Sequence, residues 1–266
     1  MSRLRGRAPG TILVALSEEL RDREAAVAPH DDAALEAGSL LARGFRCPCE
    51  TVHVPCGSGD ARPPDEALLD AIGRRDDPLL VLGARSRFPA AGRTTRGVVT
   101  FLTCPVWIQR GPWTAPRRVL AAIADPLGDR DVLRVGVAVS AMLGARLDVA
   151  HCRESATPGV GSIARSDLDA LVDSVSQSID EAGGPEGDVG VLEVAGPAGV
   201  ALAPHLERAD LTILGRGARR GLGRVLHEVI GRRRGPFVVV PPTPRPGYAR
   251  HSAFENGKTS GVASSR

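Results

Sequence analysis

The chain is poor in aromatic residues: Phe, Trp and Tyr together make up 3% of its 266 residues. The hydrophobic core must therefore consist mainly of Val, Leu, Ile and Ala, and short aliphatic runs of these residues favour the buried strands of a parallel sheet. Hydrophobic residues make up 42% of the chain, which is enough for a sizeable core. The length fits one large domain or two domains of about 130 residues each.

The sequence also lacks a strong charge, a targeting segment and a membrane span. The net charge of +3 gives no reason to expect nucleic acid or an acidic membrane as a partner. The first apolar run, residues 11–16, is too short for a signal peptide. No run approaches the roughly 20 apolar residues of a membrane helix. We therefore expect a cytoplasmic protein that binds neither nucleic acid nor membranes.

The five cysteines do not form a recognisable metal or disulfide pattern. The spacing of Cys47 and Cys49 does not fit a zinc knuckle, and no His-rich motif follows them. We interpret the cysteines as reduced thiols, with a redox or metal role as the alternative. No Ser lies in a G-x-S-x-G elbow, and His151 next to Cys152 is interpreted as a strand end rather than as a nucleophile pair. We expect no catalytic residues and no metal site.

What the chain does have is an internal repeat. Residues 79–109 and 211–241 each contain an apolar run, an Arg- and Gly-rich loop, a short helical stretch, a Pro and a second apolar run. In both copies a loop glycine lies thirteen residues before the proline, at Gly92 and Pro105 and at Gly223 and Pro236. A repeat of this kind indicates that one structural unit has been duplicated.

The second half of the chain has the more regular pattern. Its apolar runs predict strands at 119–123, 147–150, 189–194, 211–214 and 237–240, alternating with helices at 129–144, 166–182, 200–208 and 223–234. Ser166 is the predicted N-cap of the second helix, whose apolar face comprises Leu168, Leu171, Val172, Val175 and Ile179. This alternation favours parallel strands with right-handed crossovers and helices on both faces of the sheet.

The first half shows the same ending but a shorter beginning. We expect strands at 12–16, 50–54, 79–82 and 105–109, and helices at 33–43 and 65–73, but none at 18–32, which is charged and contains Pro29. The first strand and the glycine loop are 71 residues apart here (Ile12 to Gly83), against 96 in the second half (Val119 to Gly215). The 25 missing residues amount to about one helix and one strand.

These patterns divide the chain into four parts. Residues 1–110 form a reduced α/β unit, 111–118 a short linker, 119–242 a complete α/β unit, and 243–266 a polar tail that we expect to be disordered. The linker is short, so we expect the two units to pack together.

A glycine-rich loop between strand and helix is a candidate phosphate site, because backbone N–H groups and the helix dipole favour an anion there. The loop after residue 214 contains Gly215, Gly217, Gly221 and Gly223 with four arginines among them. It matches neither the GxxxxGK[ST] nor the GxGxxG pattern. We weigh a solvated basic loop against a phosphate site.

In their order and spacing these features resemble the universal stress protein (UspA-like) family. The opening runs TILVAL and RVLAAIAD, the stretch MLGARLDVAHC, the segment from VLEVAG to LTILGRG, and the ending CPVW or GPFVVV all have counterparts there. The resemblance implies α/β units of the adenine-nucleotide α-hydrolase-like, Rossmann-like type. It implies two such doubly wound units in tandem, paired internally through their last strands, so that 105–109 and 237–241 approach each other.

In the nucleotide-binding members of this family the loop reads Gly, two residues, Gly, nine residues, Gly and Ser or Thr. Here Gly215 is followed by Ala218 and then by Gly223 and Arg224, so the loop is about five residues too short. The family's acidic residue after the first strand falls at Ala124, one place before Asp125. The resemblance therefore implies no cofactor, with ATP as the alternative. A nucleotide would use Asp125, Gly196, Gly215, Gly217, Gly223 and Arg224.

The function that the resemblance implies is a non-enzymatic role in the stress response or its regulation. The alternative is a nucleotide-binding switch that uses the second unit for ATP or AMP, and a minor alternative is an α/β nucleotide hydrolase. A homodimer and an unidentified protein partner are both left open by the sequence.

Overall fold

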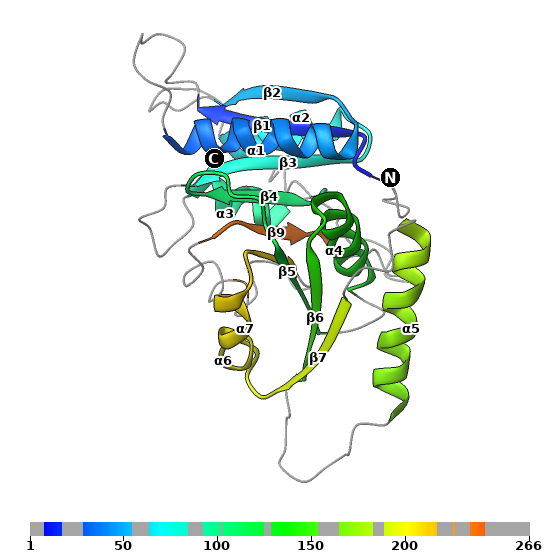
Figure 1. The fold of residues 1–266 in the computed structure, drawn as a ribbon. Coiled ribbons are helices and arrows are strands. Elements are labelled where there is room, and N and C mark those ends of the chain that lie inside the picture. The colour runs from blue at the N-terminus through cyan, green and yellow to red at the C-terminus, as the bar shows by residue number, and fades with distance from the viewer. Residues whose placement is uncertain are drawn as a thin grey trace, which may run out of the picture.

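The structure, a computed structural model, describes residues 8–17, 29–54, 64–84, 93–101, 103–124, 129–153, 165–182, 189–216, 226 and 235–242. These residues form one nine-stranded sheet in the order β2-β1-β3-β4-β9-β8-β5-β6-β7, with helices on both faces (Figure 1). All neighbouring strands are parallel except β4 and β9. The predicted α/β, Rossmann-like class is therefore confirmed.

The first half of the sheet comes from residues before the linker. It contains β1 (Thr11–Ser17), α1 (Pro29–Phe45), β2 (Cys49–Val54), α2 (Pro64–Gly73), β3 (Pro78–Ala84), α3 (Arg93–Phe101) and β4 (Val106–Arg110). One expectation was wrong: α1 begins at Pro29, four residues before the predicted helix. Pro29 does not break α1 because proline is tolerated in the first turn, where its missing N–H would have no helical partner.

The second half follows the predicted alternation closely. It contains β5 (Arg118–Ile123), α4 (Arg130–Leu143), β6 (Arg146–Arg153), α5 (Arg165–Ala182), β7 (Val189–Ala195), α6 (Ala198–Ala201), α7 (Ala203–Arg208), β8 (Leu211–Gly215) and β9 (Phe237–Val240). The helix predicted at 200–208 is two short helices. They meet at Leu202, because Pro204 has no N–H with which to continue the first. The helix predicted at 223–234 lies outside the described residues, apart from Leu226.

Two further expectations concern α5. Ser166 lies inside the helix, which begins at Arg165, and is not a cap that precedes it. Val172 was expected on the apolar face but is 44% exposed, whereas Val175 is buried. The reason is that α5 packs mainly against α4 and stands beside the sheet rather than on it (Figure 1). Val172 is therefore exposed although the apolar pattern places it on the buried face.

The strand registers of the two halves correspond. In the first half Ile12 lies opposite Leu79, and Leu80 lies opposite Val106. In the second half Val119 lies opposite Leu211, and Thr212 lies opposite Phe237. The central helices α1 and α4 correspond too, because each has a glycine packed closely against the first strand of its half. Any side chain on Gly38 of α1 would collide with Val14 of β1, and a Cβ on Gly136 of α4 would come 3.2 Å from Ala121 of β5.

The same registers locate the residues that the first half lacks. Matched positions are 98 residues apart at the second strand (Cys49 and Leu147) and 132 apart at the third (Leu79 and Leu211). The first half is thus 34 residues shorter between these strands, where the second half has α5 and β7. The difference is larger than the 25 residues counted from the sequence. The first half is 9 residues longer between its first and second strands, which masks part of the deficit.

Without a counterpart of β7, β2 lies at the edge of the described sheet. One face of β2 is open as a result. Cys49, Thr51 and His53 on this face are exposed, whereas the matching residues of β6, Leu147, Val149 and His151, are buried. At two of these three positions, Cys49 and Thr51 stand in place of Leu147 and Val149, the larger apolar side chains that suit a covering helix.

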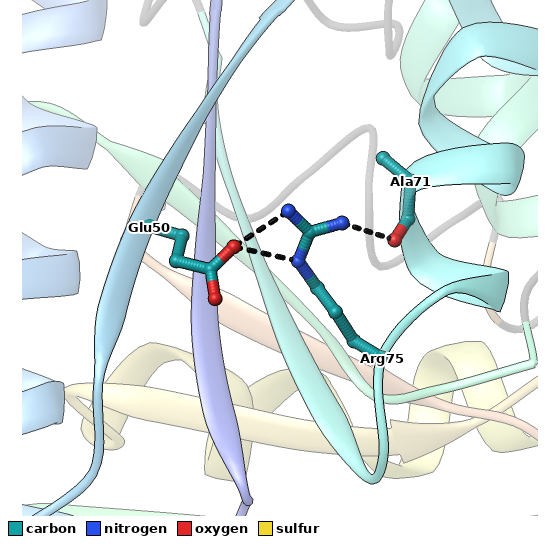
Figure 2. Close-up of polar contacts among 3 residues, drawn as sticks. All are labelled: Glu50, Ala71 and Arg75. Carbon is teal, nitrogen blue, oxygen red and sulfur yellow. Dashed lines mark hydrogen bonds and ion pairs between the residues drawn. The ribbon is translucent and has the colours of Figure 1, made fainter.

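An ion pair holds β2 to the helix that covers its other face. Arg75 follows α2, and its Nε and Nη2 both donate to Oε2 of Glu50 on β2, at 2.8 and 2.5 Å (Figure 2). Its Nη1 donates to the carbonyl oxygen of Ala71 at 2.7 Å. A charged pair at an edge strand also discourages another strand from pairing there.

The two halves meet at β4 and β9, the only antiparallel pair among the described strands. Trp107 lies opposite Val238, and the contact predicted between the last strands is confirmed. Trp107 is fully buried and packs against Trp113 of the linker, with ring centroids 5.7 Å apart. Its Nε1 donates to Oε1 of Gln109 at 2.9 Å. The side chain of Gln109 in turn donates to the carbonyl oxygen of Gly111, so the strand and the linker are tied together.

Replacing Trp107 tests this junction. We expect Trp107→Ala to lower the free energy of unfolding by about 3 kcal/mol or more, because a fully buried aromatic side chain would leave a cavity. Denaturant melts followed by circular dichroism measure the change. Trp113→Ala, at a half-buried position, should have a smaller effect. A Trp107→Ala protein that melts like the wild type would contradict the packed junction.

Candidate functional site

The carboxyl ends of β5 and β8 meet at one edge of the sheet, where open α/β sheets bind their ligands. Of the predicted site residues, Gly196 and Gly215 are described, and Asp125, Gly217, Gly223 and Arg224 lie outside the described residues. Gly196 follows β7 and has a φ of +118°, a conformation that favours glycine. It lies three strands away from Gly215, or about 14 Å at the usual strand spacing. The two glycines therefore share an edge but do not form one contact site.

Asp129 is a site residue that the sequence reasoning missed. It directly precedes α4, where Asp commonly caps a helix, but its side chain makes no cap hydrogen bond. Instead Oδ2 accepts the N–H of Ala124 at 2.8 Å, at the end of β5. Its carbonyl oxygen accepts the N–H of Val132 at 2.9 Å. The residue thus ties the end of β5 to the first turn of α4.

The Asp129 carboxylate also explains Gly215. A Cβ on Gly215 would lie 2.9 Å from Oδ1 of Asp129 and 3.3 Å from a methyl group of Val132. The glycine is therefore required by packing against Asp129, whether or not a ligand approaches it. A carboxylate at this point places negative charge beside the loop that would hold a phosphate, and like charges repel.

Among the residues that the structure describes at this edge, Arg216 is one that could hold an anion. Its backbone N–H donates to the carbonyl oxygen of Val240 at 2.9 Å, which anchors it to β9. Its side-chain Nε is buried and has no hydrogen-bond partner among the described residues. Burial lowers the pKa of the guanidinium, because desolvation disfavours the charged form. An anion could supply the missing acceptor.

Cys47, Cys49 and Cys104 are free thiols. Burial raises the pKa of Cys104 to about 12, and it also raises the pKa of Cys47 and Cys49. In the described part of the chain, no three His, Cys, Asp or Glu residues gather where they could hold a metal ion. Among these same residues, none of the helices combines the length and apolar character needed to cross a bilayer.

The thiols should differ in reactivity, since only the thiolate reacts with alkylating reagents. With iodoacetamide at pH 8, the exposed Cys49 should be labelled in the native protein. Cys104 is 3% exposed and keeps its proton, so it should react only after unfolding. Peptide mass spectrometry measures both sites. Equal labelling rates for the two in the native protein would contradict the structure.

The sheet order and the ligand edge are those of doubly wound α/β proteins. Within this class, residues 116–241 match the family model of the universal stress protein family. The second half of the chain is therefore a universal stress protein domain, and the resemblance found in the sequence is confirmed for that half. No curated protein matches the chain.

Two solved structures extend the likeness in fold over nearly the whole chain. A functionally unknown protein from Pseudomonas aeruginosa PAO1 has a TM-score of 0.57 at 14% identity, and the match covers 89% of this chain and 94% of that one. A universal stress protein from Archaeoglobus fulgidus DSM 4304 has a TM-score of 0.53 at 18% identity, with 87% and 86% covered.

Proposed function

We propose that this chain is a cytoplasmic tandem universal stress protein: two units of one fold, packed as an internal pair, with a non-enzymatic role in the stress response. The observation that carries the proposal is the matched register on either side of β4 and β9. Trp107 and Val238 each stand two residues after the proline of their repeat, and they lie directly opposite each other. Two equivalent positions meet in this way only at a local two-fold axis.

The proposal includes that ATP is not bound in the manner usual for the family. Three features support this. The loop that begins at Gly215 is too short for the family pattern, and the Asp129 carboxylate lies against its first glycine. The family's acidic position after the first strand is Ala124, whose backbone N–H is already bonded to Asp129.

A nucleotide-binding switch is the second candidate, and Arg216 is the observation that favours it. Its buried Nε lacks a partner among the described residues and lies at the edge where a phosphate would arrive. The two candidates differ in what Asp129 does. In the first it excludes the nucleotide, and in the second it is only a structural tie.

Calorimetric titration with ATP separates these candidates. We expect the wild-type protein to bind ATP weakly or not at all. Asp129→Asn keeps a side-chain oxygen for the N–H of Ala124 but removes the charge, so it should tighten any residual binding roughly tenfold. Val200→Leu, at an exposed site on α6, is the matched control and should change nothing. A sub-micromolar dissociation constant for the wild type would favour the switch.

An assay of phosphate release addresses the minor alternative, a nucleotide hydrolase. We expect no release from ATP above that of buffer, with or without Mg²⁺. Turnover that persists through repeated purification and is lost in Arg216→Ala would contradict the non-enzymatic role.

A further inference from the structure

The connection between α1 and β2 holds two cysteines in defined places. Helix α1 ends in a Schellman motif, in which the N–H of Arg46 donates to the carbonyl oxygen of Arg43 at 3.3 Å. The N–H of Cys47 donates to the carbonyl oxygen of Ala42 at 3.0 Å. Arg46 has a φ of +56°, the left-handed conformation that this motif requires. Backbone hydrogen bonds therefore fix the position of Cys47 relative to α1.

Cys49 is fixed from the side of the sheet. It begins β2, where it lies opposite Ile12 of β1. The carbonyl oxygen of Pro48 accepts the N–H of Ile12 at 2.9 Å. The proline ring locks φ at about −65°, so the residue between the two cysteines adds little freedom. Two residues of extended chain span at most about 7 Å, which limits the distance between the two cysteine α-carbons.

Both thiols lie on the face of the sheet that α1 covers. Cys47 packs against the hydrophobic cluster of this face. A Cβ on Gly38 of α1 would come 3.7 Å from Sγ of Cys49, so this thiol also faces α1. Helix α1 packs mainly over β1 and β3, and none of the described helices of the first half takes the place of α5 beside β2. Cys49 is therefore exposed and Cys47 half-buried, and an ion from solvent can reach both sulfurs.

The chemistry of the pair favours a metal ion over an oxidant. Cysteines that sense oxidants have a low pKa. Burial instead raises the pKa of both thiols, and the neighbouring Cys49 thiolate raises that of Cys47 further. A metal ion that prefers sulfur displaces these protons as it binds.

The number of ligands selects among such metals. Zinc sites and iron–sulfur clusters use about four protein ligands. Within the part of the chain that the structure describes, no third His, Cys, Asp or Glu joins the two thiols in a group that could hold a metal ion. Cu(I) is also selected by soft thiolate ligands, and two of them complete its linear coordination.

We propose that Cys47 and Cys49 form a binding site for one Cu(I) ion, held between their two sulfurs. Metal–thiolate bonds are roughly 2.3 Å long, so the sulfurs of a linear site lie about 4.5 Å apart, which the spacing of the two residues allows. Each thiol releases its proton to solvent when the ion binds, and no electron is transferred. The site lies at the amino end of β2 and uses none of the residues of the strand-end site.

Competition with the coloured Cu(I) chelator bicinchoninate tests the site on the full, reduced chain under nitrogen. We expect the wild-type protein to take one Cu(I) per chain from the chelator. Cys47→Ser and Cys49→Ser should each weaken binding by more than about a hundredfold, because the loss of an outer-shell partner alone costs about 10- to 100-fold in metal affinity. Cys104→Ala removes a buried thiol elsewhere, so it is the matched control and should bind like the wild type.

X-ray absorption of the copper-loaded protein provides a second readout. It should show two sulfur neighbours around each copper. Circular dichroism should give the same spectrum for the wild type and for Cys49→Ser, because the exposed position tolerates the change. The loss of binding in this variant then reports on the ligand and not on the fold.

Three results would overturn the proposal. Binding as in the wild type by both serine variants would place the copper elsewhere in the chain. Loss of binding in Cys56→Ser, at a position outside the described residues, would show that a further thiol completes the site. A reduced wild-type protein that leaves all copper with the chelator, but forms a Cys47–Cys49 disulfide with hydrogen peroxide, would make the pair a redox couple instead.

Discussion

The antiparallel pairing of β4 with β9 is the contact on which the rest of the molecule depends. Each strand would otherwise be the open edge of a small sheet, with a row of unpaired backbone groups. Paired, they turn two sheets of four and five described strands into one continuous sheet. They also fix which helices face each other across the junction, and they bury Trp107 and Phe237 completely.

The antiparallel sense of this pair has a second effect. The carboxyl ends of the first-half strands point toward one edge of the sheet, and those of the second-half strands point toward the other. The amino ends of β1, β3 and β4 therefore lie beside the first turns of α4. This explains why Pro9 and Pro105, far from α4 in the sequence, share a groove with Val135 and Ala138.

Much of this could be read from the sequence because it depends on periodicity. The aliphatic runs predicted the strands to within a few residues, and Gly144 ends α4 in the left-handed conformation, as a C-cap should. The resemblance to the universal stress protein family implied the contact between the last strands. The start of α1 was missed because Pro29 reads as a helix breaker unless its place in the first turn is known.

The site was harder to predict because it depends on contacts between distant residues. Gly215 looked like a phosphate-loop glycine, and only the structure shows that it makes room for Asp129. Asp129 itself carried only the signal of a helix cap. The exposure of Val172 on α5 has a similar origin: a helix pattern shows which residues are apolar but not which neighbour they meet.

Joining the two halves in one chain permits contacts that two identical chains could not make. At the axis of a homodimer, each residue meets its own copy. Here Trp107 meets Val238, and the sulfur of Met142 fills the space that Gly44 leaves open. Both pairs join equivalent positions of the two halves, and both set a large side chain against a small one. A symmetric pair would crowd two tryptophans together or leave two glycines over a void. Because the two halves belong to one chain, equivalent positions at their junction can carry different residues. The packing there is therefore free of the constraint that a symmetric homodimer would impose.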